Sequence, residues 1–278
     1  STTARPAAWA SRPRQSRLRP PRPRPLLRRA RPSLRVRQPR ALEQLYQQAD
    51  IGEVEKLFQG TPFAEMNEVS PLWLQLKPGG AAAAKAVELC RANRAGILLT
   101  SRDTPENALL HARRLLRMNS KSDGDSLARV YDPAFWSALA LTVPAQALLG
   151  PWQSVYTPPA HIDDMNWRVW EQTQEFDAST GDHRYPLQLQ ETTLVAFDEV
   201  RWWYWIRARE AESANNLPNE ELPGVSENLQ LLVDHGIEEG RHLERLLPQL
   251  NQSPLRARAD VMNVLSSDMP AFEKVQRL

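Results

Sequence analysis

The order of apolar and polar positions from residue 41 onward predicts short strands that alternate with helices. Runs of β-favouring apolar residues predict the strands, and apolar residues three or four positions apart predict the helices. This alternation is typical of an α/β lobe, with which a mixed strand order is as compatible as a parallel one. The predicted strands lie near 70–76, 95–100, 127–131 and 152–156, and the predicted helices between them lie near 81–92, 105–116 and 133–141.

The segment ahead of the first predicted strand has helical spacing throughout. Apolar residues between 42 and 49 predict a helix, which Asp50-Ile51-Gly52 ends. The apolar residues of 54–58 then predict a second short helix or turn, closed by Gly60-Thr61-Pro62.

The second half of the chain is mainly helical in its spacing. Residues 191–212 predict one long helix, whose Trp202-Trp203-Tyr204-Trp205 run places aromatic rings on all of its sides. Residues 226–247 and 255–275 predict two further helices. At least one ring of the aromatic run must therefore be covered by something other than solvent.

These patterns predict an α/β (α+β) N-terminal lobe with a mixed sheet, followed by a mainly helical C-terminal lobe. Pro158-Pro159 marks the boundary between the two. The expected domains are thus a tail at 1–40, the α/β lobe at 41–158 and the helical lobe at 159–278.

Charge is distributed very unevenly along the chain. The net charge is +2, but residues 1–40 hold 13 of the 35 basic side chains and no acidic one, so the remainder carries a formal −11. With eight prolines as well, residues 1–40 are expected to be disordered or extended. Three interpretations stay open: a solvated tail, an arm that neutralises nucleic-acid phosphates, or sequence translated outside the native reading frame.

Other features exclude several protein classes. A single cysteine, Cys90, rules out an internal disulfide and fits a reducing cytoplasm; we expect it to be a buried, inert thiol. No apolar run approaches the roughly 20 residues that span a bilayer, and no secretory signal is recognisable. The sequence therefore predicts no membrane partner.

Evidence for catalysis is weak. His235 and His242, with Glu238 or Glu239, could face one metal ion from a helix, but the spacing is not that of the tight zinc motif. We interpret Asp163-Asp164 and Asp177 with Asp182 as polar residues of ordinary turns. Nucleotide-binding glycine loops and a nucleophile elbow are absent from the sequence. We expect no enzyme activity, no cofactor, no metal and no small-molecule substrate.

Three ordered motifs resemble the domain-of-unknown-function 4123 family. The first combines Arg129-Val130-Tyr131-Asp132-Pro133, a helix, and the Gly150-Pro151-Trp152 segment. The second is the Ser70–Leu76 strand, and the third is the Ala95–Ser101 strand with the helix of Leu109–Leu116. The family's usual opening strand, of the Tyr-Xaa-Leu-Leu-Asp type, is missing here, so the sheet could be one strand short.

The resemblance implies a function through binding alone. Members of this family are adaptor chaperones of bacterial type VI secretion, which load toxic effectors onto the valine-glycine repeat spike protein, VgrG. The implied partners are a cognate secreted effector and VgrG, in the cytoplasm of a Gram-negative bacterium. The alternative is a nucleic-acid-binding regulator that uses the Arg-rich arm. Of the two kinds of partner, we expect proteins rather than nucleic acid.

Within this interpretation, two regions are candidates for partner contact. Asp132 is expected to cap the following helix and Arg129 to pair with a nearby acid, and the same motif is a candidate for shaping the surface that holds a client. Trp202 and Trp205, interpreted as lying on different sides of their helix, are candidates because tryptophan is enriched at interfaces. The predicted partner-binding residues are Arg129, Tyr131, Asp132, Trp136, Trp152, Trp202 and Trp205.

Overall fold

A computed structural model describes residues 43–120, 124–160, 166–172, 186–210, 217–251 and 253–278. The predicted tail at 1–40 lies outside these residues, as do the carboxylates of 163–164 and of 177–182. The missing opening strand is likewise a prediction that the described residues do not address.

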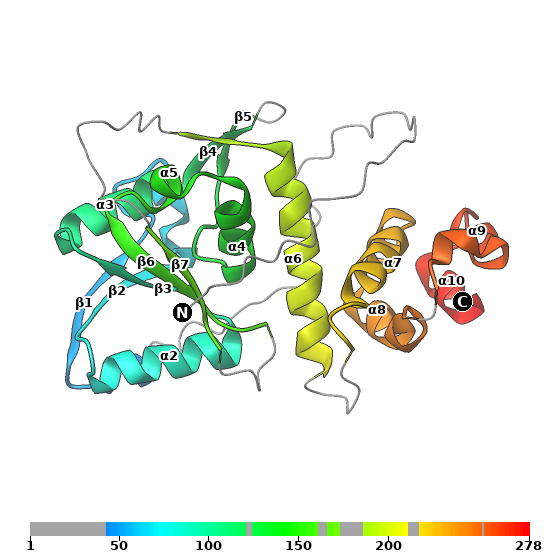
Figure 1. Ribbon diagram of the computed structural model, residues 1–278, viewed down its shortest axis with the longest axis horizontal. Coiled ribbons are helices and arrows are strands. Elements are labelled where there is room, and N and C mark those ends of the chain that lie inside the picture. Colours follow the sequence, from blue (N-terminus) through cyan, green and yellow to red (C-terminus); the bar gives the residue numbers. More distant parts are fainter. Residues whose placement is uncertain (1–42, 121–123, 161–165, 173–185, 211–216, 252) are drawn as a thin grey trace. The chain divides into compact units, whose positions relative to one another are not determined.

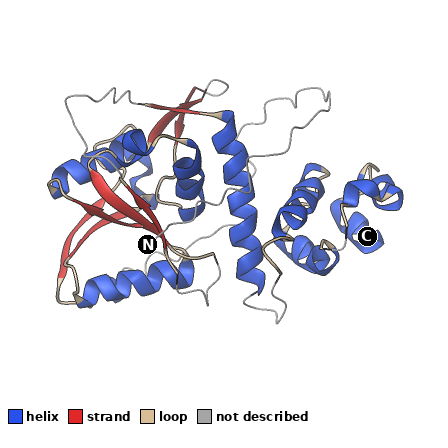
Figure 2. Ribbon diagram, viewed as in Figure 1, coloured by secondary structure: helices blue, strands red, loops and turns tan. Residues whose placement is uncertain are grey.

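Among the described residues, eight strands form three small sheets (Figures 1 and 2). They are β1 (Ile51–Lys56), β2 (Leu72–Leu76), β3 (Leu98–Ser101), β4 (Arg117–Ser120), β5 (Gly124–Leu127), β6 (Trp152–Thr157), β7 (Arg168–Glu171) and β8 (Leu187–Leu189). β1 pairs with β2, and β6 lies between β3 and β7, all antiparallel. In the third sheet β4 pairs antiparallel with β5 and parallel with β8, so this sheet is mixed.

In the first part of the chain the helices alternate with the strands, and the elements described after β8 are all helices. Those of the first part are η1 (Ala64–Val69), α2 (Ala81–Asn93), α3 (Pro105–Leu115), α4 (Pro133–Thr142) and α5 (Ala145–Leu149). Those of the second part are α6 (Glu191–Glu210), α7 (Leu222–Asp234), α8 (Gly240–Leu246), η2 (Leu247–Gln249), η3 (Leu255–Ala257), α9 (Ala259–Leu265) and α10 (Ala271–Arg277). The predicted fold class is therefore confirmed, whereas the domain boundaries stay a prediction. None of the described helices has the length and apolar content to cross a membrane.

Two of the local predictions are wrong. Residues 54–56, at the start of the predicted helix or turn, instead belong to strand β1, because they pair with β2 some twenty residues further along the chain, and only 57–60 form a turn. The strand predicted at 127–131 ends at Leu127, and the chain forms a hairpin of β4 and β5 ahead of it. Both strands depend on a pairing partner that the local apolar pattern does not reveal.

The first turn of helix α2 is capped by a residue that lies outside the helix. Its N-cap position is Gly80, which has no side chain to offer the first turn. The Asp50 carboxylate instead accepts a hydrogen bond from the Ala82 N–H at 2.9 Å. A Cβ atom on Gly80 would lie 1.9 Å from Asp50 Oδ2, so glycine is required for this cap to form.

Four aromatic rings form the centre of the first hydrophobic core. Trp152 lies among Trp136, at 5.6 Å between ring centroids, Trp73, at 6.4 Å, and His111, at 4.7 Å and edge-on. The Trp152 indole N–H donates to the Ala108 carbonyl on α3 at 3.1 Å. Strand β6 is thereby attached to α3 and α4 at one point.

The helix predicted over 226–247 is interrupted at Gly236, whose φ is +88°. Gly236 N–H donates to Val233 O at 3.0 Å, and Ile237 N–H donates to Leu232 O at 3.0 Å. This is the hydrogen-bond pattern of a Schellman motif, which ends α7. The apolar repeat continues past the break because α8 buries its leucines in the same core as α7.

Lys274 on α10 links the ends of two other helices. Its side chain is buried, and its ammonium donates to His235 O at 3.0 Å and to Leu265 O at 2.8 Å. These carbonyls lie at the C-terminal ends of α7 and α9, where a positive charge is favoured by the helix dipole. The single helix predicted over 255–275 is therefore η3, α9 and α10, held together partly by this lysine.

Asn228 on α7 is a buried polar anchor, which leads to a stability prediction. Its amide donates to Leu250 O and Ser253 O, and its Oδ1 accepts from Leu255 N–H at 2.9 Å. We expect Asn228→Ala to lower the free energy of unfolding by about 3 kcal/mol, because it leaves two buried backbone groups and a partly buried one unpaired. Denaturant titration measures this change.

The exposed Asn263 on α9 provides a matched control for that substitution. Asn263→Ala should change the free energy of unfolding by no more than about 0.5 kcal/mol. Equal effects of the two substitutions would contradict the anchoring role of Asn228.

Cys90 on α2 gives a second prediction. Burial raises the pKa of its thiol to about 12 from an ordinary 9.0. At pH 8 this shift lowers the thiolate population about a thousandfold, and the thiolate is the reactive form. We expect Ellman's reagent to modify Cys90 about a thousandfold more slowly in the folded chain than in guanidinium. Similar rates in the two conditions would contradict this environment.

Candidate partner-binding site

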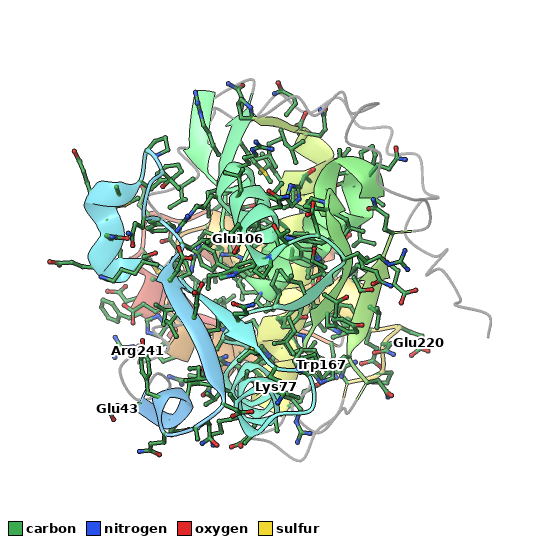
Figure 3. The ribbon with its side chains drawn as sticks, turned by 90° about the vertical axis from the view of Figure 1, so that its left-hand side faces the viewer. Glu43, Lys77, Glu106, Trp167, Glu220 and Arg241 are labelled. Carbon is green, nitrogen blue, oxygen red and sulfur yellow. The ribbon has the colours of Figure 1, made fainter. Side chains whose placement is uncertain are left out.

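A cavity of about 470 Å³ opens beside α6. Its walls come from α4, the segment 158–160 that follows β6, the start of β7, one face of α6, and residues 217–219 ahead of α7. Figure 3 labels Trp167, which directly precedes β7, and Glu220, which directly follows the wall segment 217–219. The cavity therefore joins segments that are far apart in the sequence.

Arg168 provides an exposed positive charge at this cavity. Its guanidinium lies 5.3 Å from the centre of the Trp203 ring and 5.7 Å from that of Trp170. Cation–π contacts of this kind hold a guanidinium in place without neutralising its charge. Arg168 is thus positioned by aromatic rings and keeps its hydrogen-bond donors.

Tyr204 forms another part of the wall and is held by Arg94 and by Pro158. Its hydroxyl donates to Pro158 O at 2.7 Å, and burial raises its pKa while Arg168 and Arg94 oppose the shift. Arg94, in the left-handed conformation at the end of α2, donates to Tyr204 O at 2.6 Å and to Ala160 O. Burial lowers the pKa of this arginine. Arg94 therefore attaches the first part of the chain to α6 and to the cavity wall.

The far wall depends on a buried ion pair. Arg207 Nη1 contacts Glu210 Oε2 at 2.6 Å, and the two side chains are 11% and 2% exposed. Arg207 also donates to Leu217 O and Asn219 Oδ1, while Glu210 Oε1 accepts from Leu217 N–H at 2.6 Å. These bonds fix residues 217–219 against α6, so they set the shape of the cavity on that side.

The predicted turn at Arg129–Pro133 is partly as expected. Asp132 caps α4, because its Oδ1 accepts from Ala134 N–H at 2.9 Å and from Phe135 N–H at 3.4 Å. Arg129 is exposed and lies over the Tyr131 ring at 6.0 Å, and its pairing with an acid stays a prediction. Burial raises the Tyr131 pKa, and Arg129 opposes that shift.

Trp136 and Trp152, two further predicted partner residues, lie in the core. Their exposed fractions are 0% and 2%. Gly150 directs the chain into that core: its φ is +51°, and an added Cβ would lie 2.5 Å from the His111 ring. The glycine-proline-tryptophan motif therefore serves to insert Trp152, and direct partner contact by these two rings stays an untested prediction.

Trp202 and Trp205 occupy the same side of α6, whereas the sequence is interpreted above as placing them on different sides. Their rings meet edge to face at 5.8 Å, because residues three apart on a helix are neighbours. Both are buried in the core of the helical region, and the Trp202 indole donates to Gln230 Oε1 at 3.0 Å. Their direct contact with a partner is likewise untested.

The sequence analysis missed the residues that line the cavity. Trp203 and Tyr204 lie within the predicted aromatic run, but its helical spacing alone did not indicate which side faces a cavity. Arg168 and Arg207 carry no distinguishing pattern in the sequence. The one available signal was the alternation of arginine with aromatic residues in 167–170 and 201–207.

The candidate metal ligands are not assembled. Among the described residues, no group of three or more His, Cys, Asp and Glu side chains is placed to hold a metal ion. His235 ends α7, with its Nδ1 at 2.9 Å from Leu231 O, whereas His242 lies on α8 beyond the break at Gly236. The interruption of the predicted helix separates the two histidines.

The Arg207–Glu210 pair gives a stability prediction with an internal control. Glu210→Ala should lower the free energy of unfolding by about 3 kcal/mol, because it leaves a buried guanidinium without its carboxylate. Glu244→Ala removes the partner of Arg209 in an exposed pair on neighbouring helices, and its cost should stay below about 1 kcal/mol. Thermal and denaturant unfolding measure both. Similar losses for the two variants would argue against the structural importance of the buried pair.

Comparison with known proteins identifies one family. No curated protein and no solved structure matches this chain. The model of the family described as domain of unknown function DUF4123 matches residues 35–148. The match begins inside the predicted tail and ends within α5, so it includes the elements from β1 to α4. Residues 35–148, less than half of the chain, therefore match the DUF4123 family.

Proposed function

We propose that this chain is an adaptor chaperone of type VI secretion, which binds a specific effector and brings it to the VgrG spike. The DUF4123 match over residues 35–148 carries this proposal. Its motifs resemble those of adaptors that act by binding, and the proposed mechanism likewise involves no covalent step. The proposed location is the cytoplasm of a Gram-negative bacterium.

The cavity beside α6 supports a role in binding. Arginine, tryptophan and tyrosine are the residue types most enriched where proteins make strong contacts, and all three line this cavity. Because Arg94, Tyr204 and the Arg207–Glu210 pair fix its walls, a partner would meet a preformed surface and lose less entropy on binding.

The seven predicted partner-binding residues divide into two groups in this proposal. Arg129, exposed beside the partly buried Tyr131 and Asp132, is available for direct contact. The four tryptophans are buried, so they would act by holding the elements that present the surface. The acidic remainder of the chain, at a formal −11, would favour clients with basic surfaces outside the cavity.

Co-expression with the product of the neighbouring downstream gene tests this function. Adaptor genes of this family usually lie next to that of their effector, so we expect a one-to-one complex. Size-exclusion chromatography at low and high salt should show it in both conditions, because buried apolar contacts resist screening by salt. The downstream protein should be less soluble when it is expressed alone.

A variant lacking residues 1–34 separates this function from the nucleic-acid alternative. It keeps the whole DUF4123 match, and the adaptor proposal expects it to retain the complex. If no complex forms, and if the 278-residue chain carries nucleic acid that the variant loses, the regulator is favoured and the adaptor proposal fails.

A further inference from the structure

We propose that the η1 loop, residues 57–71, binds a basic and partly apolar segment of the client protein, in which arginine or lysine side chains flank aliphatic ones. That this segment belongs to the client rests on the proposed adaptor function. The chemistry of the loop does not, since it follows from the loop's own side chains. The η1 loop joins β1 to β2, contains η1 and lies within the residues that match DUF4123.

The η1 loop is closed at its base and anchored in the first hydrophobic core. Leu57 N–H donates to Pro71 O, and Phe58 N–H donates to Ser70 Oγ, both at 2.9 Å. The Phe58 side chain is buried, and its ring packs against that of Phe63 at 6.1 Å between centroids. A compact surface loop whose ends meet in this way is an Ω-loop, a class that frequently carries function. A partner would therefore meet a preformed surface, which lowers the entropy cost of binding.

The η1 loop also presents two apolar side chains to solvent. Met66 is 41% exposed and Val69 is 67% exposed, and η1 itself lies at the left edge of the ribbon in Figure 3. Single exposed apolar residues are ordinary on protein surfaces, but these two lie three positions apart in one short helix. Methionine is enriched at protein interfaces and adapts to partners of different shape. The two side chains thus offer a small apolar surface to aliphatic groups of a partner.

Two carboxylates lie beside these apolar residues and give the η1 loop its charge. Glu65 and Glu68 are exposed, and neither forms an ion pair or a hydrogen bond through its carboxylate with a residue that the structure describes. Residues 57–71 contain no Lys, Arg or His, so the loop carries a formal −2. Basic groups of a partner complement these carboxylates while its aliphatic groups cover Met66 and Val69.

The Arg-rich arm of this chain is the competing occupant, because residues 1–40 hold 13 arginines and no acidic residue. Residues 1–34 lie outside the DUF4123 match, whereas the η1 loop lies inside it. Binding of a client is the activity proposed for the matched residues, so we assign the loop to the client. A variant that lacks residues 1–34 tests the arm.

A peptide probe tests the chemistry of the η1 loop on the 278-residue chain. The probe is acetyl-Arg-Leu-Leu-Arg-amide, and the two control peptides replace either the arginines with glutamate or the leucines with serine. Methionine methyl groups labelled with carbon-13 report the result, with the Met66 signal assigned through Met66→Leu. We expect the probe to shift the Met66 signal in a saturable way, and each control peptide to bind at least about fivefold more weakly. The signals of Met262 and Met269, which lie in the helical region, should not move.

Charge variants supply the second part of the test. The double variant Glu65→Gln with Glu68→Gln should weaken binding of the probe about fivefold, because two exposed ion pairs are lost. Glu220→Gln with Glu221→Gln is the matched control: both residues are exposed at the start of α7, and the change in charge is the same. Its affinity for the probe should equal that of the unaltered chain.

The complex with the downstream gene product tests the source of the segment. Met66→Ser with Val69→Ser should weaken binding of that client about tenfold or more, because the apolar surface of the loop is lost. Phe272→Ser is the control, since Phe272 on α10 is 53% exposed and lies outside the loop. Thermal unfolding of all variants confirms that each is folded.

Four results would overturn the proposal. They are no saturable shift of the Met66 signal, equal affinity for the glutamate peptide, client affinity that Met66→Ser with Val69→Ser leaves unaltered, and a Met66 signal that moves when residues 1–34 are removed. The last result would make the arm the occupant of the loop. If the client binds and its affinity does not depend on the loop, this inference is wrong and the adaptor proposal stands. If the probe binds and no client does, the adaptor proposal fails, and with it the client as the source, while the chemistry of the loop stands.

Discussion

The Trp202–Trp205 run in the second half of helix α6 places aromatic rings around the helix, and all four of them are buried or partly buried. Trp202 and Trp205 pack into the core of the helical region, while Trp203 and Tyr204 face the cavity wall. α6 packs against both α4 and α7, and Figure 1 shows it between them. α6 meets α4 through Phe197, whose ring lies edge to face against Phe135 at 5.2 Å, and through Thr193. It meets α7 through Trp202 and Trp205.

Elements with strong local signals could be predicted from the sequence, and those defined by distant pairing could not. The caps and prolines that begin α3 and α4 lie within a few residues of the helices they start. Strand β1 instead follows from its partner β2, and β5 consists of Gly-Asp-Ser-Leu, which has little apolar character. The Schellman turn at Gly236 was missed because the leucine repeat continues across it.

The same distinction applies to the candidate site. The capping role of Asp132 was predictable because the carboxylate and the N–H groups that donate to it are three residues apart at most. The burial of Trp136 and Trp152 could not be predicted in this way. Trp152 is covered by His111 and Trp73, which lie far from it in the sequence. The cavity combines segments from residue 137 to residue 219, and no local pattern indicates which of their side chains come together.

The cap of α2 has a consequence for how the protein opens. Asp50 precedes β1 directly and is 32 residues from Ala82, whose N–H it accepts. The first turn of α2 therefore keeps its cap only while Asp50 and the adjoining β1 strand stay in place. Amide protons in that turn and in the β1–β2 ladder should exchange with solvent as one cooperative unit, although η1 and β2 lie between β1 and α2 in sequence. A helix with its own capping side chain would open independently of the sheet.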